Sequence, residues 1–293
     1  MENGLKKYHP VTNLIFFASV IVFGMILRHP LTLGVCFVAA FVWYIRLCGK
    51  AAVKSVCTFL LPMLILVTVL NGLFARYGRT ELFYLFGRKA ITLESLVFGF
   101  ALGLTTVTVI IWFFCFNEVV ESDKLMFLFG RIFPSAGLVI IMALRFVPMY
   151  RKRIDIISQA QKGLCADGDS NDKIKAGGKI ISVLFTWSLE NSVETSYSMR
   201  ARGYGLKSRK SYARYKFRTK DTILSAVMLV LDVVLIAGCV SKTVYCSYNP
   251  YISIPQFSVF GAVIIISFAV LCFLPLIIEL REDIKWNRLK SKI

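Results

Sequence analysis

The feature that most constrains this chain is the separation of its apolar residues from its charges. The sequence has 293 residues, of which 57% are hydrophobic, yet its formal net charge is +18. Long uncharged apolar runs are typical of chains that cross a bilayer, whereas a soluble domain of this length carries fewer apolar residues. We therefore predict an all-α polytopic membrane protein with about six transmembrane helices and a cytoplasmic module of amphipathic helices.

Six apolar runs approach or reach the length of about 17–25 residues that crosses a bilayer. Four precede a long polar segment and two follow it. Lys and Arg gather in alternate loops, so the positive-inside rule predicts that both termini lie in the cytoplasm. Only the loop 76–90, predicted to lie outside, carries several cations against this rule. The predicted spans are 11–27, 31–47, 56–75, 91–116, 222–240 and 257–278.

The segment 117–220 contains 19 Lys and Arg against 9 Asp and Glu. Its two apolar stretches, 133–144 and 180–189, are too short to span and are predicted to form buried or interfacial helices. The sequence thus predicts four parts along the chain. They are transmembrane helices 1–4 in 1–116, a cytoplasmic helical module in 117–220, transmembrane helices 5 and 6 in 221–280, and a basic cytoplasmic tail in 281–293.

The sequence predicts no catalytic, cofactor or metal site. It contains no GxxxxGK[ST] phosphate loop, and its eight cysteines include no CxxC pair. The two histidines, His9 and His29, each precede a proline, which suits the start of a segment better than metal ligation. Anionic lipid headgroups and membrane topology account for the cations beside the apolar runs, so no nucleic acid partner is expected.

A single acid, Asp232, lies near the middle of the predicted span 222–240. An ionisable residue at that depth is costly and is by default a functional candidate. The alternative is that its carboxyl group is protonated or bonded to hydroxyl groups of neighbouring helices, without a role in transport. Both readings stay open, and the first would suit a stand-alone secondary transporter that uses Asp232 as an ion or proton relay.

Two helices with apolar stripes in the basic segment are predicted to end in similar motifs, Gln161-Lys162-Gly163 and Ala201-Arg202-Gly203. Both glycines are predicted to adopt the left-handed conformation that often ends a helix. Lys162 and Arg202 would then lie at the negative end of a helix dipole. Such helices lie along a surface or in a groove of a partner, and the simpler alternative is a solvated basic helix end.

Four short stretches, in this order and spacing, resemble the transmembrane T component of energy-coupling factor (ECF) transporters, which includes the cobalt-transport permease family. The resemblance covers nearly the whole chain. It implies a bacterial cell membrane protein whose coupling helices dock into grooves of a pair of ABC-type ATPases. The T component transmits the closing motion of these ATPases to a small substrate-binding membrane subunit, the S component. The stretches are Phe133-Pro134, Arg145-Phe146-Val147-Pro148, AQKG at 160–163 and SMRARGYG at 198–205.

The resemblance carries two Ala-Arg-Gly motifs onto this chain, one intact and one altered. Ala201, Arg202 and Gly203 match the second motif, whereas Gln161, Lys162 and Gly163 occupy the first. Lysine keeps the charge but lacks the planar fork that can form two parallel hydrogen bonds. This departure suggests two non-identical ATPase partners, and the resemblance does not identify the transported solute.

Overall fold

The computed structural model divides the chain into two compact units. The first combines Met1–Leu125 with Tyr215–Ile293, and the second is Met126–Arg214. Apart from one short hairpin, the regular structure of the described residues is helical, in agreement with the predicted all-α class. The described residues are 4–74, 80–85, 89–121, 124–125, 127–128, 134–164, 173–206, 215, 217–241, 243–244, 246 and 258–290.

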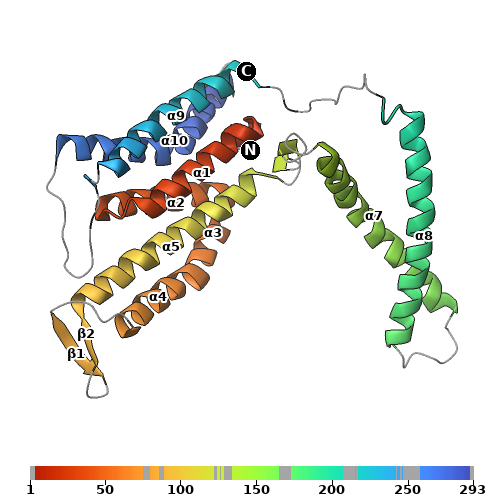
Figure 1. The fold of residues 1–293 in the computed structure, drawn as a ribbon, viewed down its shortest axis with the longest axis horizontal. Helices are drawn as coiled ribbons and strands as arrows, with labels where there is room; N and C mark the ends of the chain where they lie inside the picture. The colour runs from red at the N-terminus through yellow and green to blue at the C-terminus, as the bar shows by residue number, and fades with distance from the viewer. Residues whose placement is uncertain are drawn as a thin grey trace. The chain divides into compact units, whose positions relative to one another are not determined.

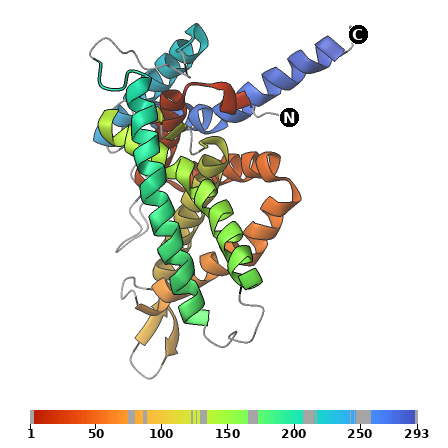
Figure 2. The ribbon, with the colours of Figure 1, turned by 90° about the vertical axis from the view of Figure 1, so that its right-hand side faces the viewer.

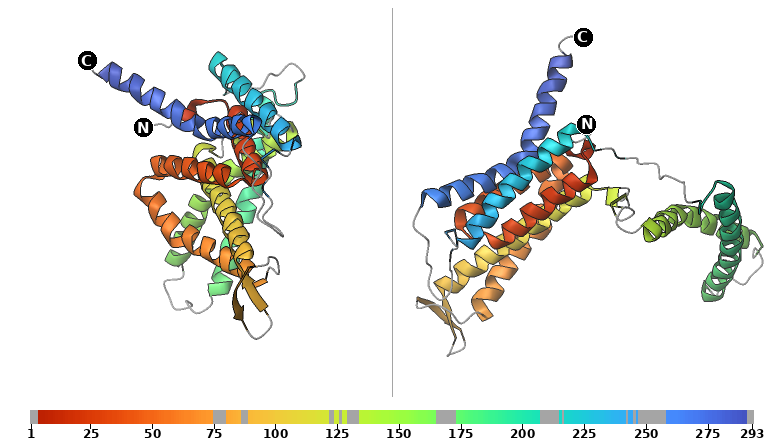
Figure 3. Two further views of the ribbon diagram at one scale, coloured as in Figure 1. Left: turned by 90° about the vertical axis from the view of Figure 1, so that its left-hand side faces the viewer. Right: turned by 45° about the horizontal axis from the view of Figure 1, so that its top comes forward.

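The first unit is a bundle of helices packed side by side (Figure 1, Figure 3). It begins with a 3-10 turn, η1 (Gly4–Lys7), and a π-helical turn, η2 (Val56–Leu60), joins α3 to α4. Its helices are α1 (Pro10–Ile26), α2 (Pro30–Cys48), α3 (Lys50–Ser55), α4 (Leu61–Phe74), α5 (Leu93–Val119), α9 (Thr219–Val240) and α10 (Val259–Lys290). The second unit contains α7 (Pro134–Leu164) and α8 (Lys173–Ala201).

The two His-Pro pairs begin α1 and α2, as the sequence predicts. Nδ1 of His9 accepts a hydrogen bond from the amide of Val11 at 3.3 Å, and Nδ1 of His29 accepts one from the amide of Leu31 at 3.3 Å. Each proline occupies the first helical position, where a missing N–H leaves no bond unmade. Both histidines therefore act as helix N-caps.

Five helical stretches in the described part of the chain are long and apolar enough to cross a membrane. The apolar helix α1 has 17 residues and is shorter than these five. Together they confirm a polytopic membrane protein with about six spans. The predicted third span starts earlier than expected, at Lys50, because η2 continues α3 into α4. The five stretches are Pro30–Cys48, Lys50–Phe74, Leu93–Val119, Thr219–Val240 and Val259–Lys290.

Three features of the fold differ from the sequence prediction. The loop 76–90 contains most of an antiparallel hairpin, β1 (Glu81–Leu85) and β2 (Lys89–Thr92). Aromatic and β-branched residues favour strands there, but hydropathy reports only that such a segment leaves the membrane. Residues 134–144 of the first apolar stretch belong to the much longer helix α7, and the stretch 180–189 belongs to the much longer helix α8, while Phe133 lies outside the described residues. Finally, α10 continues without a break to Lys290, so no helix end separates the last span from the basic tail.

An aromatic cluster forms the centre of the first unit. Phe16 and Phe17 of α1 pack against Trp43 of α2 and Trp112 of α5, with ring centroids 5.7–6.3 Å apart. All four side chains are almost completely buried. Trp43 Nε1 also donates a hydrogen bond to Glu279 Oε1 of α10 at 3.2 Å. Aromatic packing thus joins α1, α2 and α5, and the hydrogen bond from Trp43 joins α10 to them.

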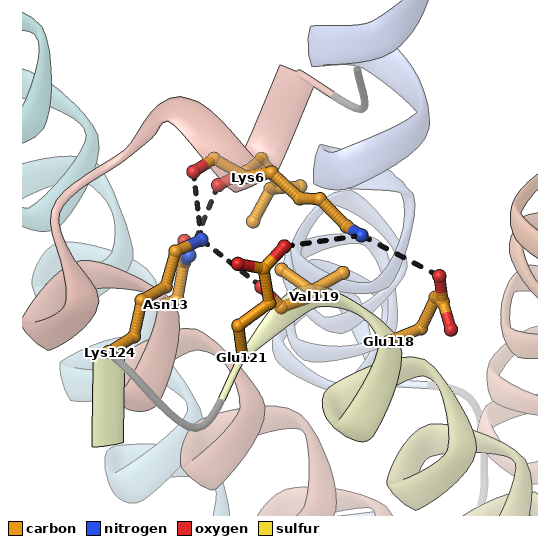
Figure 4. Close-up of polar contacts among 7 residues, drawn as sticks. Lys6, Asn13, Glu118, Val119, Glu121 and Lys124 are labelled. Atoms are coloured by element: carbon orange, nitrogen blue, oxygen red, sulfur yellow. Dashed lines mark hydrogen bonds and ion pairs between the residues drawn. The ribbon is translucent and has the colours of Figure 1, made fainter. Parts of the chain in front are cut away.

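The ammonium group of Lys124, at the end of the N-terminal segment of the first unit, is held by backbone carbonyl groups (Figure 4). Its Nζ donates to the carbonyl oxygens of Lys6 at 2.8 Å and Val119 at 3.1 Å. Val119 ends α5, so Lys124 satisfies a carbonyl that has no partner within that helix. The pKa of Lys124 is lowered, because the effect of burial outweighs the opposing effect of the nearby Glu121 carboxylate. Glu118 and Glu121 also pair with the Lys6 ammonium at 3.5 and 3.7 Å.

Replacing Lys124 with Met is expected to destabilise the first unit by about 1–3 kcal/mol, because two carbonyl groups lose their buried donor. Lys7→Met is the matched control. The Lys7 ammonium is partly exposed and pairs with Glu282 at 3.3 Å, and such surface pairs contribute only about 0–1 kcal/mol. The unfolding midpoint of each variant in mild detergent would be measured by intrinsic fluorescence. Equal midpoints for the two variants would contradict the assigned role of Lys124.

Candidate functional site

The two long helices of the second unit, α7 and α8, run in opposite directions (Figure 1). They pack through aromatic side chains near the middle of each helix. The rings of Tyr150 and Trp187 meet edge to face with centroids 5.8 Å apart, and Phe146 stacks on Tyr150. The Arg153 guanidinium carbon lies 4.9 Å from the centroid of the Trp187 ring, a cation–π contact. Trp187 therefore fixes α8 against α7.

The first predicted motif lies inside the last turn of α7. Gln161 is partly buried, and Lys162 and Gly163 are exposed. The predicted left-handed conformation of Gly163 is wrong, because the described glycines with positive φ are Gly49, Gly203 and Gly205. The helix continues through Gly163 to Leu164, since a helix tolerates glycine and is not obliged to end there. The chain directly after Leu164 lies outside the described residues.

The second predicted motif ends α8 in the expected way. Gly203 has φ of +78°, which is the left-handed region that favours glycine. The Gly203 amide donates to the carbonyl oxygen of Arg200 at 2.9 Å, and the Tyr204 amide donates to that of Met199 at 3.0 Å. These two bonds form the Schellman motif that closes many helices. Arg202 is thereby held as the C-cap residue, next to the negative end of the helix dipole.

A stripe of exposed apolar side chains leads along α8 to Ala201. Its members recur at every fourth position, so they follow one slowly turning face of the helix. Each is more than half exposed, in a helix whose other exposed residues are largely polar. Exposed apolar surface of this extent is typical of a face that binds a partner or a membrane. The stripe consists of Ile181 (68% exposed), Phe185 (63%), Leu189 (53%), Val193 (54%) and Tyr197 (68%).

The two motifs lie at opposite ends of the second unit, because α7 and α8 are antiparallel (Figure 1). A helix of 29 residues is about 43 Å long, so one small surface could not contact both motifs. Ala201 and Arg202 are exposed, as is Lys162. Within the described residues, no ion pair joins Lys162 or Arg202 to a carboxylate. Both cations are therefore available to separate partner surfaces.

Asp232 belongs to the first unit, whereas both predicted motifs belong to the second. Ser19 Oγ of α1 donates a hydrogen bond to Asp232 Oδ2 at 2.7 Å, which ties α1 to α9. The other carboxyl oxygen, Oδ1, is buried and has no hydrogen-bond partner in the described part of the chain. The structure thus brings Asp232 to a hydroxyl group of a neighbouring helix, the arrangement expected if its role is structural.

Two sets of residues were missed by reasoning from the sequence. The contact of Tyr150 and Arg153 with Trp187 depends on the antiparallel return of α8, which no local pattern encodes. The sequence hinted at this contact only by placing a tryptophan, Trp187, among polar residues of a helix. Lys124 was counted with the other cations of its segment, although it is buried and bonded to carbonyl groups.

Comparisons with known proteins agree with a multi-pass membrane protein. A family model described as cobalt transport protein, CbiQ, matches residues 1–212. The energy-coupling factor transporter transmembrane protein EcfT of Lactococcus lactis subsp. cremoris is 31% identical over 104 residues, which are 34% of this chain and 39% of the relative. EcfT of Streptococcus thermophilus is 32% identical over 103 residues, with the same two shares.

The matched region spans about two-fifths of the length of these two relatives. The family model, in contrast, covers well over half of this chain. The protein therefore belongs to the CbiQ family of cobalt transport proteins.

Proposed function

We propose that this chain is the transmembrane energy-coupling subunit of an ECF-type ABC importer. It binds two non-identical ABC-type ATPases and transmits their hydrolysis of ATP to a separate S component that takes up a vitamin or a metal ion. The chain itself is not an enzyme. It lies in the bacterial cell membrane with both termini in the cytoplasm, and the module 117–220 faces the ATPases.

The observation that carries this proposal is the end of α8. An exposed apolar stripe leads to Arg202, and the Schellman motif at Gly203 holds this cation at the tip of the helix. A helix with an apolar face and a cation at its closed end suits a groove that offers apolar side chains and a carboxylate. The names of the EcfT relatives support the same assignment.

The position of the first motif supports two different ATPase surfaces. Lys162 lies near the end of α7, at the opposite end of the unit from Arg202. Lys162 is a compact point charge on a regular helix, whereas Arg202 is a planar donor on a helix end closed by glycine. Surfaces that recognise such different ends are expected to differ from each other.

Affinity purification of the tagged full-length chain from its own membranes in mild detergent tests the proposal. Two ATPase subunits and one small membrane protein are expected to co-purify, and the small protein would then indicate the solute. A chain that purifies alone and supports uptake without an ATPase would instead be the stand-alone secondary transporter.

Asp232 separates the coupling subunit from the secondary transporter. Asp232→Asn is expected to leave uptake within about twofold of the wild-type rate, because an amide oxygen still accepts the hydrogen bond from Ser19. A relay requires a group that ionises, which asparagine cannot do. Uptake of the solute by whole cells is the measurement, with membrane abundance of the chain as its control. Complete loss of uptake at normal abundance would favour the relay.

A further inference from the structure

The last helix of the first unit is longer than a membrane span. α10 has 32 residues, or about 48 Å, whereas the hydrocarbon core of a bilayer is about 30 Å thick. It contains Pro275, and its C-terminal end projects beyond the other helices of the bundle (Figure 2, Figure 3). The residues that follow the apolar part, from Glu279 onward, therefore emerge at the level of the lipid headgroups.

Three acidic side chains contact the rest of the bundle where α10 leaves it. Glu279 accepts the hydrogen bond from Trp43 and lies 3.9 Å from Arg46 of α2. Asp283 pairs with the same Arg46 at 3.5 Å. Glu282, between them, pairs with Lys7 of η1 at 3.3 Å. Three carboxylates are thus engaged with cations or donors of the first unit, and they fix the helix at its base.

The opposite side of the projecting part carries apolar residues beside cations. Residues three or four apart lie on one face of a helix, so two parallel stripes result. The first is apolar and about half exposed, and the second is cationic and exposed. The apolar stripe is Ile277 (45% exposed), Leu280 (46%) and Ile284 (53%), and the cationic stripe is Arg281, Lys285 and Arg288.

We propose that Leu280–Lys290, here called the interfacial segment, lies in the plane of the membrane surface and binds anionic phospholipid headgroups. The segment directly continues a membrane span, so headgroups are the first surface that it meets. An apolar stripe flanked by Lys and Arg is the pattern of helices that insert one face at the acyl boundary and place cations against phosphate. The proposal does not depend on the ATPase partners.

Two tryptophan positions on opposite faces of the segment provide the test. Ile284 and Trp286 are two residues apart, about 200° around the helix. The full-length chain would be reconstituted in nanodiscs of acyl-brominated phosphatidylcholine with phosphatidylglycerol as the minor component. Three proteins are compared: the wild type, Trp286→Phe, and Trp286→Phe combined with Ile284→Trp. Subtracting the emission of Trp286→Phe isolates the signal of each single position.

Bromolipid quenching is expected to be at least about twofold stronger at position 284 than at position 286. It is expected to fall when phosphatidylglycerol is omitted, or when Arg281, Lys285 and Arg288 are all replaced by Gln in a variant with an unchanged unfolding midpoint. Weak quenching at both positions would place the segment away from the bilayer and overturn the proposal, leaving the face for a protein partner. Quenching that ignores both changes would overturn the assignment of anionic headgroups.

Discussion

Replacing Arg202 with Glu is expected to abolish co-purification of the ATPases and uptake, while the chain still inserts into the membrane. The guanidinium group is exposed at a rigid helix end, where a partner carboxylate can meet it in two parallel hydrogen bonds. Removing one member of a desolvated charge pair at an interface weakens binding by about 2–5 kcal/mol, or about 30-fold to over a thousandfold. Quantified co-purification and cellular uptake are the measurements.

Two comparison variants separate the loss of Arg202 from a general loss of charge. Arg200→Glu makes the same charge change two residues earlier, on another face of α8, and is expected to weaken association much less. Lys162→Glu is also expected to weaken association less, because an ammonium group forms a less directional contact than a guanidinium group. Undiminished co-purification with the Arg202 variant would refute the coupling role.

The membrane bundle was largely predictable because its main signal is local. A residue run enters the bilayer according to its own transfer free energy, and its backbone bonds are satisfied within the same helix. The predicted spans therefore lie on α1, α2, α4, α5, α9 and α10, with ends shifted by a few residues in most cases. The helix starts at His9 and His29 were predictable for the same reason, because each side chain caps the helix that directly follows it.

Contacts between distant segments were not predictable in the same way. Ser19 and Asp232 are more than 200 residues apart, so the sequence could name the acid but not its partner. Lys124 resembled a solvated cation until η1 and the end of α5 were placed beside it. The two predicted motifs show a similar limit, because one glycine closes its helix and the other does not.

A single methyl group at position 203 is expected to have the second large effect. Gly203→Ala places a β-carbon in the left-handed conformation, which costs about 1–2 kcal/mol. The added atom would also lie 3.1 Å from Leu206 Cδ1, closer than ordinary contacts. The Schellman bonds to Arg200 and Met199 then weaken, and Arg202 loses its fixed position. ATPase association is expected to fall about 5- to 30-fold in a titrated pull-down, with normal membrane abundance.

The same substitution at Gly163 is not expected to weaken ATPase association. Gly163 lies within α7, and a β-carbon added there meets no atom within 4 Å. Alanine favours a helix over glycine by about 0.5–1 kcal/mol, so ATPase association should stay unchanged or increase slightly. If Gly163→Ala and Gly203→Ala weakened association equally, added bulk at the interface would be the cause. A loss of association for Gly203→Ala alone would mean that the two motifs differ in backbone conformation as well as in their cations.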